Sequence, residues 1–198
     1  MTSTNLRITC GTLKGRRLQC KLSEDVRPTS EKVRQAVYNM LGNDLTGIKL
    51  LDLCGGSGIM CFEAISRNAE KVTLIEQTSF IIKTLRRNMD HLGISPDKLK
   101  IFCAPFQRAI PRLKGHKYEV IYFDPPYVKI KEQPPEEKDL YLSCGKLVMD
   151  CSLLSPKGVL ITEHFKMNPV DISSFGYNLV DQRVFGTIGL QFWKLKKI

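Results

Sequence analysis

The sequence has no long hydrophobic run, although 42% of its 198 residues are hydrophobic. No stretch approaches the ~20 consecutive apolar residues that a membrane-spanning helix needs. The first 17 residues also lack the apolar segment of a secretory signal peptide. These absences predict a cytoplasmic protein. A charged content of 25% is ordinary for a globular chain and argues against disorder.

Metal-ligand spacing is missing as well. The seven cysteines are odd in number and widely separated, none forms a C-x-x-C pair, and the three histidines are scattered. We therefore expect no metal site, and reduced thiols are a simpler interpretation than a disulfide framework. A chain of this length buries roughly 70% of its unfolded surface and needs no such cross-links.

Positive charge is in excess, with 30 lysines and arginines against 20 aspartates and glutamates. Half of that excess lies in residues 1–40, which contain eight basic and three acidic side chains. Such a cluster suits a polyanionic partner, with nucleic acid as the first candidate, or a solvated face that only aids solubility. Charge alone does not decide between the two.

Apolar runs alternate with helical periodicities after residue 44. Runs that predict strands lie at 48–53, 71–76, 99–103, 119–123 and 158–163, and helical spacing lies near 59–67, 81–92 and 136–153. This alternation predicts an α/β fold with a mostly parallel, Rossmann-like sheet covered on both faces. Two further strands near 178–185 and 190–196 follow each other without a helix, so we expect an antiparallel hairpin at one edge of a seven-stranded sheet.

A smaller, basic segment precedes this pattern. Runs at 6–10 and 16–22 predict a hairpin. A helix is expected from an N-cap at Thr29 or Ser30 to about Leu41. We therefore divide the chain into an N-terminal hairpin and helix, residues 1–43, and a larger domain, residues 44–198.

A glycine-rich loop joins the first strand of the larger domain to its first helix. It contains Asp52, Cys54, Gly55, Gly56, Ser57 and Gly58. Glycines at such a turn let the backbone approach a ligand closely, and the helix N-terminus offers free N–H groups. Glu76 ends the next strand, where an acid can accept hydrogen bonds from both hydroxyls of a ribose. Together these features predict a cofactor that contains adenosine.

The loop also distinguishes between cofactors. A dinucleotide fold uses G-x-G-x-x-G to seat a pyrophosphate, and here Cys61 stands at the third glycine position. Asp52, just before the turn, would repel a pyrophosphate but suits a cationic ammonium group. We therefore expect S-adenosylmethionine rather than NAD.

Asp124-Pro125-Pro126-Tyr127 follows the strand at 119–123. The amine of a nucleobase is a poor nucleophile because its lone pair is delocalised into the ring. The Asp124 carboxylate and the Pro125 carbonyl are suited to accept its N–H groups and free that lone pair. The prolines fix the backbone, and the Tyr127 ring offers a surface on which a base can stack. A proline turn that only ends a strand is the alternative interpretation.

These motifs resemble a known family. DPPY together with LDLCGGSG is shared by class I S-adenosylmethionine-dependent amino methyltransferases that act on nucleobases. The stretches RITCGTLKGRRLQ, RPTSEKVRQAVYNML and LLDLCGGSGIMCFEAISRNAEKVTLIEQ are similar to the bacterial enzymes that methylate the exocyclic N2 of one guanine in 16S ribosomal RNA. The resemblance extends to VFGTIGLQFWKL near the C-terminus and implies the class I methyltransferase fold.

The resemblance also implies roles for individual residues. Those that hold and activate the guanine amine are Asp124, Pro125, Pro126 and Tyr127. Those expected to hold the cofactor are Asp52, Cys54, Gly55, Gly56, Ser57, Gly58, Glu76, Gln77, Ala104 and Thr29. Such enzymes often carry an acid or amide on the adenine side, where this chain has Cys103-Ala104-Pro105, so a backbone N–H of Ala104 is the expected donor.

The basic N-terminal residues are expected to bind RNA phosphates. They are Arg7, Lys14, Arg16 and Arg17, to which the resemblance adds Arg27 and Arg34 over the cofactor and RNA entrance. The expected partner is 16S ribosomal RNA, in the small subunit or its assembly intermediate. We expect the protein to act on it as a monomer.

Three alternatives remain open. The first is N6 methylation of adenine in DNA or RNA, although 198 residues leave no obvious separate target-recognition domain. The second is a non-catalytic RNA-binding ribosome-assembly factor with a relic pocket, against which the intact Asp52, Glu76 and Asp124 argue. The third, an NAD oxidoreductase, is disfavoured by the missing third glycine. The choice of guanine over adenine rests on the resemblance alone.

Overall fold

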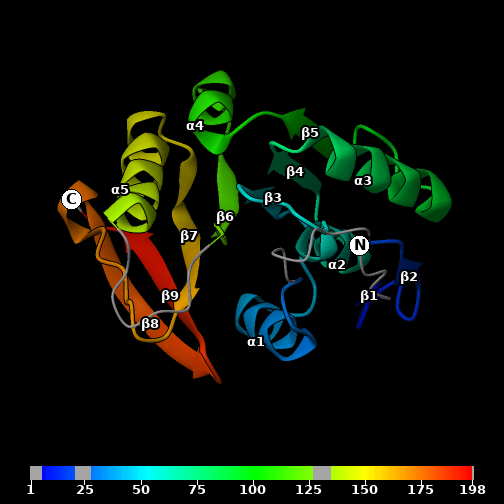
Figure 1. The fold of residues 1–198 in the computed structure, drawn as a ribbon, viewed down its shortest axis with the longest axis horizontal. Helices are drawn as coiled ribbons and strands as arrows, with labels where there is room; N and C mark the ends of the chain where they lie inside the picture. The colour runs from blue at the N-terminus through cyan, green and yellow to red at the C-terminus, as the bar shows by residue number, and fades with distance from the viewer. Residues whose placement is uncertain (1–5, 21–27, 127–134, 198) are drawn as a thin grey trace. The chain divides into compact units, whose positions relative to one another are not determined.

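Residues 6–20, 28–126 and 135–197 are described by a computed structural model of the chain. The chain forms two units, Met1–Ala104 and Pro105–Ile198 (Figure 1). Their strands together give the mostly parallel seven-stranded α/β class that the sequence predicts. No helix in the described ranges is apolar and long enough to span a bilayer.

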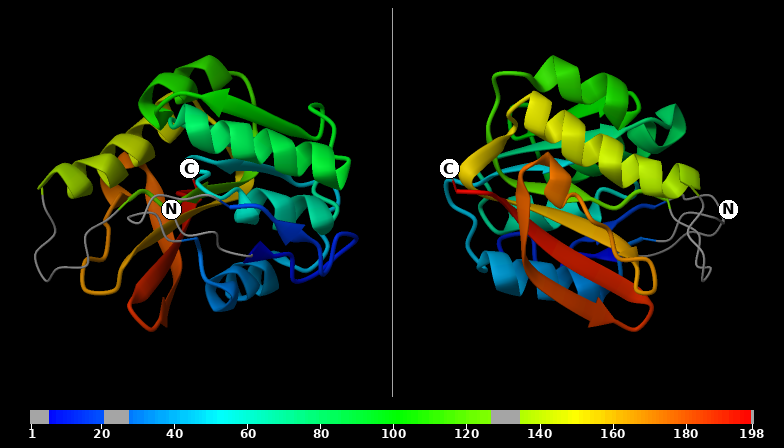
Figure 2. Two further views of the ribbon diagram at one scale, coloured as in Figure 1. Left: turned by 45° about the vertical axis from the view of Figure 1, so that its right-hand side comes forward. Right: turned by 90° about the vertical axis from the view of Figure 1, so that its left-hand side faces the viewer.

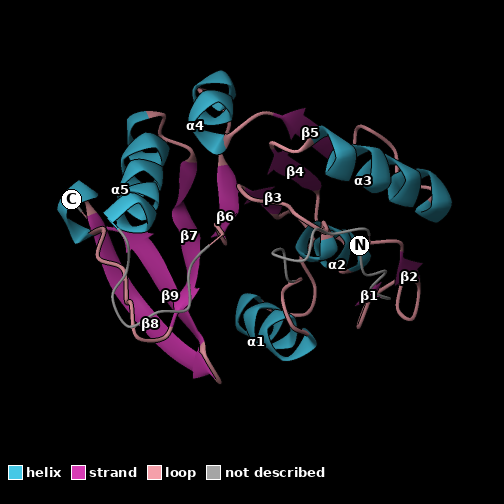
Figure 3. Ribbon diagram, in the orientation of Figure 1, coloured by secondary structure: helices cyan, strands magenta, loops and turns pink. Residues whose placement is uncertain are grey.

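The first unit contains three parallel strands in the order β5-β4-β3. Its main elements are β3 (Lys49–Asp52), α2 (Ile59–Ser66), β4 (Lys71–Glu76), α3 (Ser79–Leu92) and β5 (Leu99–Cys103) (Figure 3). Asp52 pairs in register with Leu74, and Glu76 pairs with Cys103. The carboxyl ends of the strands therefore lie at one edge of the sheet, which is where α/β folds bind ligands.

The N-terminal hairpin and helix are part of this unit. The hairpin pairs β1 (Leu6–Arg7) with β2 (Arg17–Leu18), and α1 spans Glu31–Leu41. Ser30 Oγ accepts a hydrogen bond from the Val33 N–H at 3.3 Å, which confirms Ser30 as the N-cap. The hairpin turn binds α2, because the N–H of Thr12 donates to Ser66 O at 2.7 Å. The predicted domain boundary at residue 43 stays a prediction.

A buried ion cluster joins the hairpin and α1 to α2. Glu63 on α2 has no exposed side-chain surface and lies 3.7 Å from Arg34 Nε and 3.5 Å from Arg67 Nε. Its Oε1 also accepts hydrogen bonds from the N–H and hydroxyl of Thr9, both at 2.7 Å. The Arg67 guanidinium in turn lies over the ring of Tyr38, 4.7 Å from its centre. Charged contacts therefore hold three sequence segments together inside this unit.

The second unit contains four strands in the order β6-β7-β9-β8. Its elements are α4 (Phe106–Ala109), η1 (Ile110–Leu113), β6 (Tyr118–Phe123), α5 (Pro135–Asp150), β7 (Leu154–Phe165), η2 (Ser173–Phe175), β8 (Tyr177–Phe185) and β9 (Ile188–Leu195). β6 and β7 are parallel, whereas β9 is antiparallel to both β7 and β8. The expected antiparallel C-terminal hairpin is therefore confirmed.

Helix α5 packs on β7 in this unit, where the Tyr141 hydroxyl donates to Glu163 O at 2.7 Å (Figure 2). The sequence did not predict α4 and η1. Each spans only four residues, which is too short for a helical period to be visible.

Candidate functional site

The loop between β3 and α2 is held closely against the neighbouring strand. The Gly55 N–H donates to Ile75 O at 2.8 Å, and the Gly58 N–H donates to Gly55 O at 2.7 Å. A Cβ at Gly55 would lie 2.4 Å from Leu74 Cγ, so glycine is needed for the loop to lie this close to β4.

Gly56 and Gly58 both have positive φ, 48° and 73°. A Cβ at Gly58, the N-cap of α2, would lie 2.5 Å from Leu85 Cδ2. At Gly56 the nearest heavy atom would be Cys54 O, 3.9 Å away, so the loop leaves open space there. Gly55 and Gly58 thus fix the loop, while open space remains beside the backbone of Gly56.

Glu76 lies beside this loop at the end of β4. Its Oε2 accepts from the Gly56 N–H at 2.9 Å, and its Oε1 accepts from the Thr78 N–H at 2.7 Å. Each carboxylate oxygen keeps a further lone pair. Glu76 is therefore oriented by backbone donors and suited to accept hydrogen bonds from a pair of hydroxyl groups.

Asp52 is the second carboxylate of the site and is only 2% exposed. Its Oδ1 accepts from the Cys54 N–H at 3.2 Å, and the Cys61 thiol lies 3.5 Å from Oδ2. Burial raises the pKa of Asp52 to about 7, and the negative charge of Glu76 adds to the effect. A buried carboxylate of this kind suits a ligand with a cationic group.

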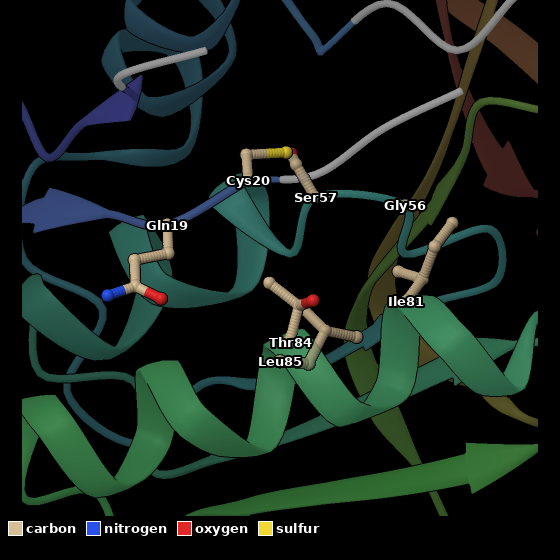
Figure 4. A pocket seen from close by; sticks show the side chains of 7 residues that line it. All are labelled: Gln19, Cys20, Gly56, Ser57, Ile81, Thr84 and Leu85. Atoms are coloured by element: carbon tan, nitrogen blue, oxygen red, sulfur yellow. The ribbon is translucent and has the colours of Figure 1, made fainter. Parts of the chain in front are cut away.

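Ser57 completes the loop, and a narrow cleft opens beside it. Ser57 Oγ accepts from the Ile59 N–H at 3.3 Å, in the first turn of α2. The cleft is lined by Gln19, Cys20, Gly56, Ser57, Ile81, Thr84 and Leu85 (Figure 4). The glycine loop, the end of the hairpin and helix α3 therefore border one cleft.

Ala104 does not provide the free donor expected for an adenine. Its N–H donates to Glu76 O at 3.1 Å, because the pairing of β4 with β5 continues one residue past Cys103. That prediction is wrong for the Ala104 N–H. Gln77 is exposed directly after Glu76 and stays a predicted cofactor contact.

The Asp124-Pro125-Pro126-Tyr127 segment begins in the second unit, immediately after β6. Asp124 is half-buried, Pro125 is buried and Pro126 is exposed, while Tyr127 lies outside the described residues. Just before the motif, the Phe123 ring packs edge-on against Phe106 at 5.0 Å and Tyr141 at 5.5 Å between ring centres. This aromatic packing fixes the strand end from which Asp124 projects.

The predicted RNA-binding side chains divide into two groups. Four of the six are exposed, namely Arg7, Lys14, Arg16 and Arg17, and Arg27 lies outside the described residues. Arg34 is only 3% exposed, so its predicted RNA contact is wrong. Its guanidinium instead donates to Thr29 O at 2.7 Å and to Arg7 O at 3.1 Å. Thr29 is also buried, and a cofactor contact there stays a prediction.

The Arg34–Glu63–Arg67 cluster is not evident from the sequence. An acid and a base four residues apart on a helix usually form a solvent-exposed pair, so Glu63 and Arg67 were unremarkable. The available signal is the sequence of α2, which is apolar on every side apart from Glu63 and Ser66 and therefore predicts a buried helix.

Comparisons with known proteins agree with this fold. The chain is 26% identical over 194 residues to "Ribosomal RNA small subunit methyltransferase D" of Haemophilus influenzae, covering 96% of this chain and 93% of that protein. The Escherichia coli protein yhhF superposes with a TM-score of 0.79 at 21% identity, covering 98% of this chain and 99% of that one. The structure of SMU.776 complexed with SAH gives a TM-score of 0.69 at 13% identity, covering 90% of this chain and 53% of that one.

A family model described as "Conserved hypothetical protein 95" matches residues 6–194. That match includes the hairpin, the glycine loop and the Asp124-Pro125-Pro126-Tyr127 segment. The chain therefore belongs to the family described as conserved hypothetical protein 95.

Proposed function

We propose that this protein transfers a methyl group from S-adenosylmethionine to the exocyclic N2 amine of a guanine in 16S ribosomal RNA. The observation that carries the proposal is the joint presence of two features. One is the glycine loop flanked by Asp52 and Glu76, and the other is the Asp124-Pro125-Pro126 motif after β6. The name of the Haemophilus influenzae relative supports ribosomal RNA as the substrate class.

The residues of the first unit fit S-adenosylmethionine better than a dinucleotide. The buried Asp52 carboxylate would hold the ammonium of the methionine part, and Glu76 would hold the ribose hydroxyls. Open space at Gly56 admits a ligand against the backbone. When bound, the cofactor supplies a methyl group on a sulfonium centre, which is already activated toward an amine.

The residues after β6 prepare the amine. The Asp124 carboxylate and the Pro125 carbonyl accept its two N–H groups, which favours a pyramidal nitrogen with a free lone pair. After transfer the amine is cationic, and its proton leaves to Asp124 or to water. Most of the rate enhancement then comes from positioning, because the methyl donor needs no further activation.

The test of this function is to identify the product. The protein is incubated with labelled S-adenosylmethionine and small ribosomal subunits that lack the modification, and the methylated nucleoside is identified by mass spectrometry. We expect N2-methylguanosine. Detection of N6-methyladenosine would instead identify adenine as the target base. No product, together with no thermal stabilisation by S-adenosylhomocysteine, would indicate a non-catalytic protein.

Cofactor affinity is expected to depend on pH through Asp52. Burial raises the pKa of Asp52 to about 7, so the neutral acid predominates below pH 7 and attracts an ammonium group less. S-adenosylhomocysteine should therefore bind on the order of tenfold more weakly at pH 5.5 than at pH 7.5, since one pH unit below a pKa lowers the ionised fraction about tenfold. Isothermal titration calorimetry measures this dependence.

The matched variant for this measurement is Asp52→Asn, which keeps the size of the side chain but cannot ionise. It should bind S-adenosylhomocysteine weakly at both pH values, with little change between them. A wild-type affinity that is flat from pH 5.5 to 7.5 would contradict the assigned role of Asp52.

A further inference from the structure

The N-terminal hairpin is fixed against helix α3. The Gln19 N–H donates to Asn88 Oδ1 at 3.0 Å, and Asn88 Nδ2 donates to Gln19 O at 2.8 Å. Arg16 also donates through its guanidinium to His91 O at 3.2 Å. The Asn88 side-chain amide thus pairs with the backbone N–H and C=O of Gln19, as a neighbouring strand would. Figure 4 shows this segment, which follows β2, running beside α3. The hairpin and α3 therefore share one surface.

The sequence of α3 places a particular stripe next to the hairpin. Thr84 and Asn88 face the hairpin, because Thr84 lines a cleft with Gln19 and Asn88 binds Gln19 directly. At 100° per residue, Phe80, Lys83 and Arg87 lie on the adjoining side of the helix. All three are exposed. The other flank of Thr84 and Asn88 is buried, formed by Ile81, Ile82, Leu85 and Met89.

Phe80 is unusual on this stripe because it is a large aromatic side chain that is 43% exposed. Lys83 and Arg87 lie three and seven residues after it. Within the described ranges, neither of these cations forms an ion pair, nor does Arg16 or Arg17 on the hairpin. A solvated helix face would account for the cations but not for an exposed ring among them.

An exposed ring followed by cations that form no ion pair suits the binding of single-stranded nucleic acid. Every unpaired base has a face that can stack on an aromatic ring, whereas the bases of a duplex are already stacked. The stripe from Phe80 to Arg87 is roughly 10 Å long at 1.5 Å per residue. That length spans about three stacked nucleotides at ~3.4 Å each.

We propose that Phe80, Lys83 and Arg87 of α3, with Arg16 and Arg17 of the hairpin, form a binding surface for single-stranded RNA. Phe80 stacks on an unpaired base, and the four cations bind the phosphates that follow along α3 toward the hairpin. This proposal rests on the proposed function in taking RNA as the substrate. It assigns part of the recognition to α3, outside the basic N-terminal segment.

The test measures RNA binding without catalysis. The protein is saturated with S-adenosylhomocysteine and titrated into a labelled 12-nucleotide single-stranded RNA, or a 12-base-pair RNA duplex, at several salt concentrations. The variants are Phe80→Ala and Arg87→Glu. Arg86→Glu is the matched control, since it changes the charge of the same helix equally but lies about 100° around it from Arg87.

Arg87→Glu should weaken single-strand binding about tenfold or more and lower the salt slope by about one, as expected for a lost phosphate contact. Arg86→Glu should change the affinity less than about threefold, because Arg86 lies about 100° around the helix from Arg87 and makes no direct phosphate contact in this arrangement. Phe80→Ala should weaken single-strand binding about tenfold and leave duplex binding unchanged.

Several outcomes would overturn the surface. If Arg86→Glu and Arg87→Glu lose equal RNA affinity, binding depends on the general positive charge of the helix and not on this surface. A Phe80→Ala variant that loses S-adenosylhomocysteine affinity but keeps RNA affinity would assign the ring to the cofactor. If the wild type makes N2-methylguanosine and both Phe80→Ala and Arg87→Glu do so equally well, the surface fails and the function stands. If RNA binding responds as expected but no methylated product forms, the function fails and the surface stands.

Discussion

Replacing Asp124 with alanine is expected to lower the rate of methyl transfer on the order of 10³-fold, the scale of losing a group that handles a proton or stabilises a developing charge. Asp124 follows β6 directly and is half-buried. Alanine removes the acceptor for the amine N–H and the negative charge that offsets the cationic product. Single-turnover methylation of small ribosomal subunits measures the effect.

Cofactor binding separates this effect from unfolding. The residues assigned to the cofactor belong to the first unit, whereas Asp124 belongs to the second. Asp124→Ala should therefore keep its affinity for S-adenosylhomocysteine within about threefold, less than the tenfold that corresponds to 1.4 kcal/mol. The thermal stabilisation by that ligand should also be retained.

Two further variants sharpen the assignment. Asp124→Asn keeps the shape of the side chain but replaces one acceptor oxygen with a donor, so it should lose nearly as much activity as Asp124→Ala. Asp181→Asn removes a partly exposed carboxylate of the same unit, which pairs with Arg183 at 3.0 Å, and should leave the rate unchanged. Comparable activity in Asp124→Ala and the wild type would contradict the assignment of the site.

Much of the fold was predictable because short sequence patterns, such as apolar runs and helix caps, determine its strands and helices. The run at 71–76 and the strand β4 coincide, and the Ser30 cap forms as expected. The glycine loop was equally predictable, because close packing against Leu74 and positive φ both require glycine at defined positions. At these positions the residue type in the sequence is the one that the backbone conformation and packing require.

The solvent exposure of individual arginines was not predictable in this way. Arg7 and Arg34 both belong to the basic N-terminal segment, yet one is exposed and the other is 3% exposed. The difference comes from Glu63, which is distant in sequence and provides a buried counter-charge on α2. Charge counts along a sequence identify a basic segment, but only tertiary contacts decide which of its cations reach solvent.

The Glu63 carboxylate leads to the largest expected effect on stability. It lies within ion-pair distance of both Arg34 and Arg67, and it also accepts from the Thr9 N–H. Removing one partner of a buried ion pair leaves an uncompensated buried charge, which costs about 3–5 kcal/mol. Glu63→Ala should therefore lower Tm by about 6–20 °C, at about 2–4 °C per kcal/mol for a domain of this size.

The surface of the same unit provides a matched control. Glu70 lies 3.6 Å from Lys49, and the two side chains are 46% and 43% exposed. An exposed pair of this kind contributes less than about 1 kcal/mol, so Glu70→Ala should lower Tm by at most about 4 °C. Glu63→Gln, which keeps the volume and loses the charge, should lie much closer to Glu63→Ala than to Glu70→Ala.

Hydrogen exchange locates the damage. Glu63 ties Thr9 of the hairpin to α2, and Ser66 of the same helix accepts from the Thr12 N–H. Glu63→Gln should therefore increase the exchange of the Thr9 and Thr12 amides more than that of amides in β4, because the hairpin loses its central charged contact while the sheet does not. A Glu63→Ala variant with the stability of Glu70→Ala would mean that the two arginines find other partners, and that the buried carboxylate does not hold the hairpin.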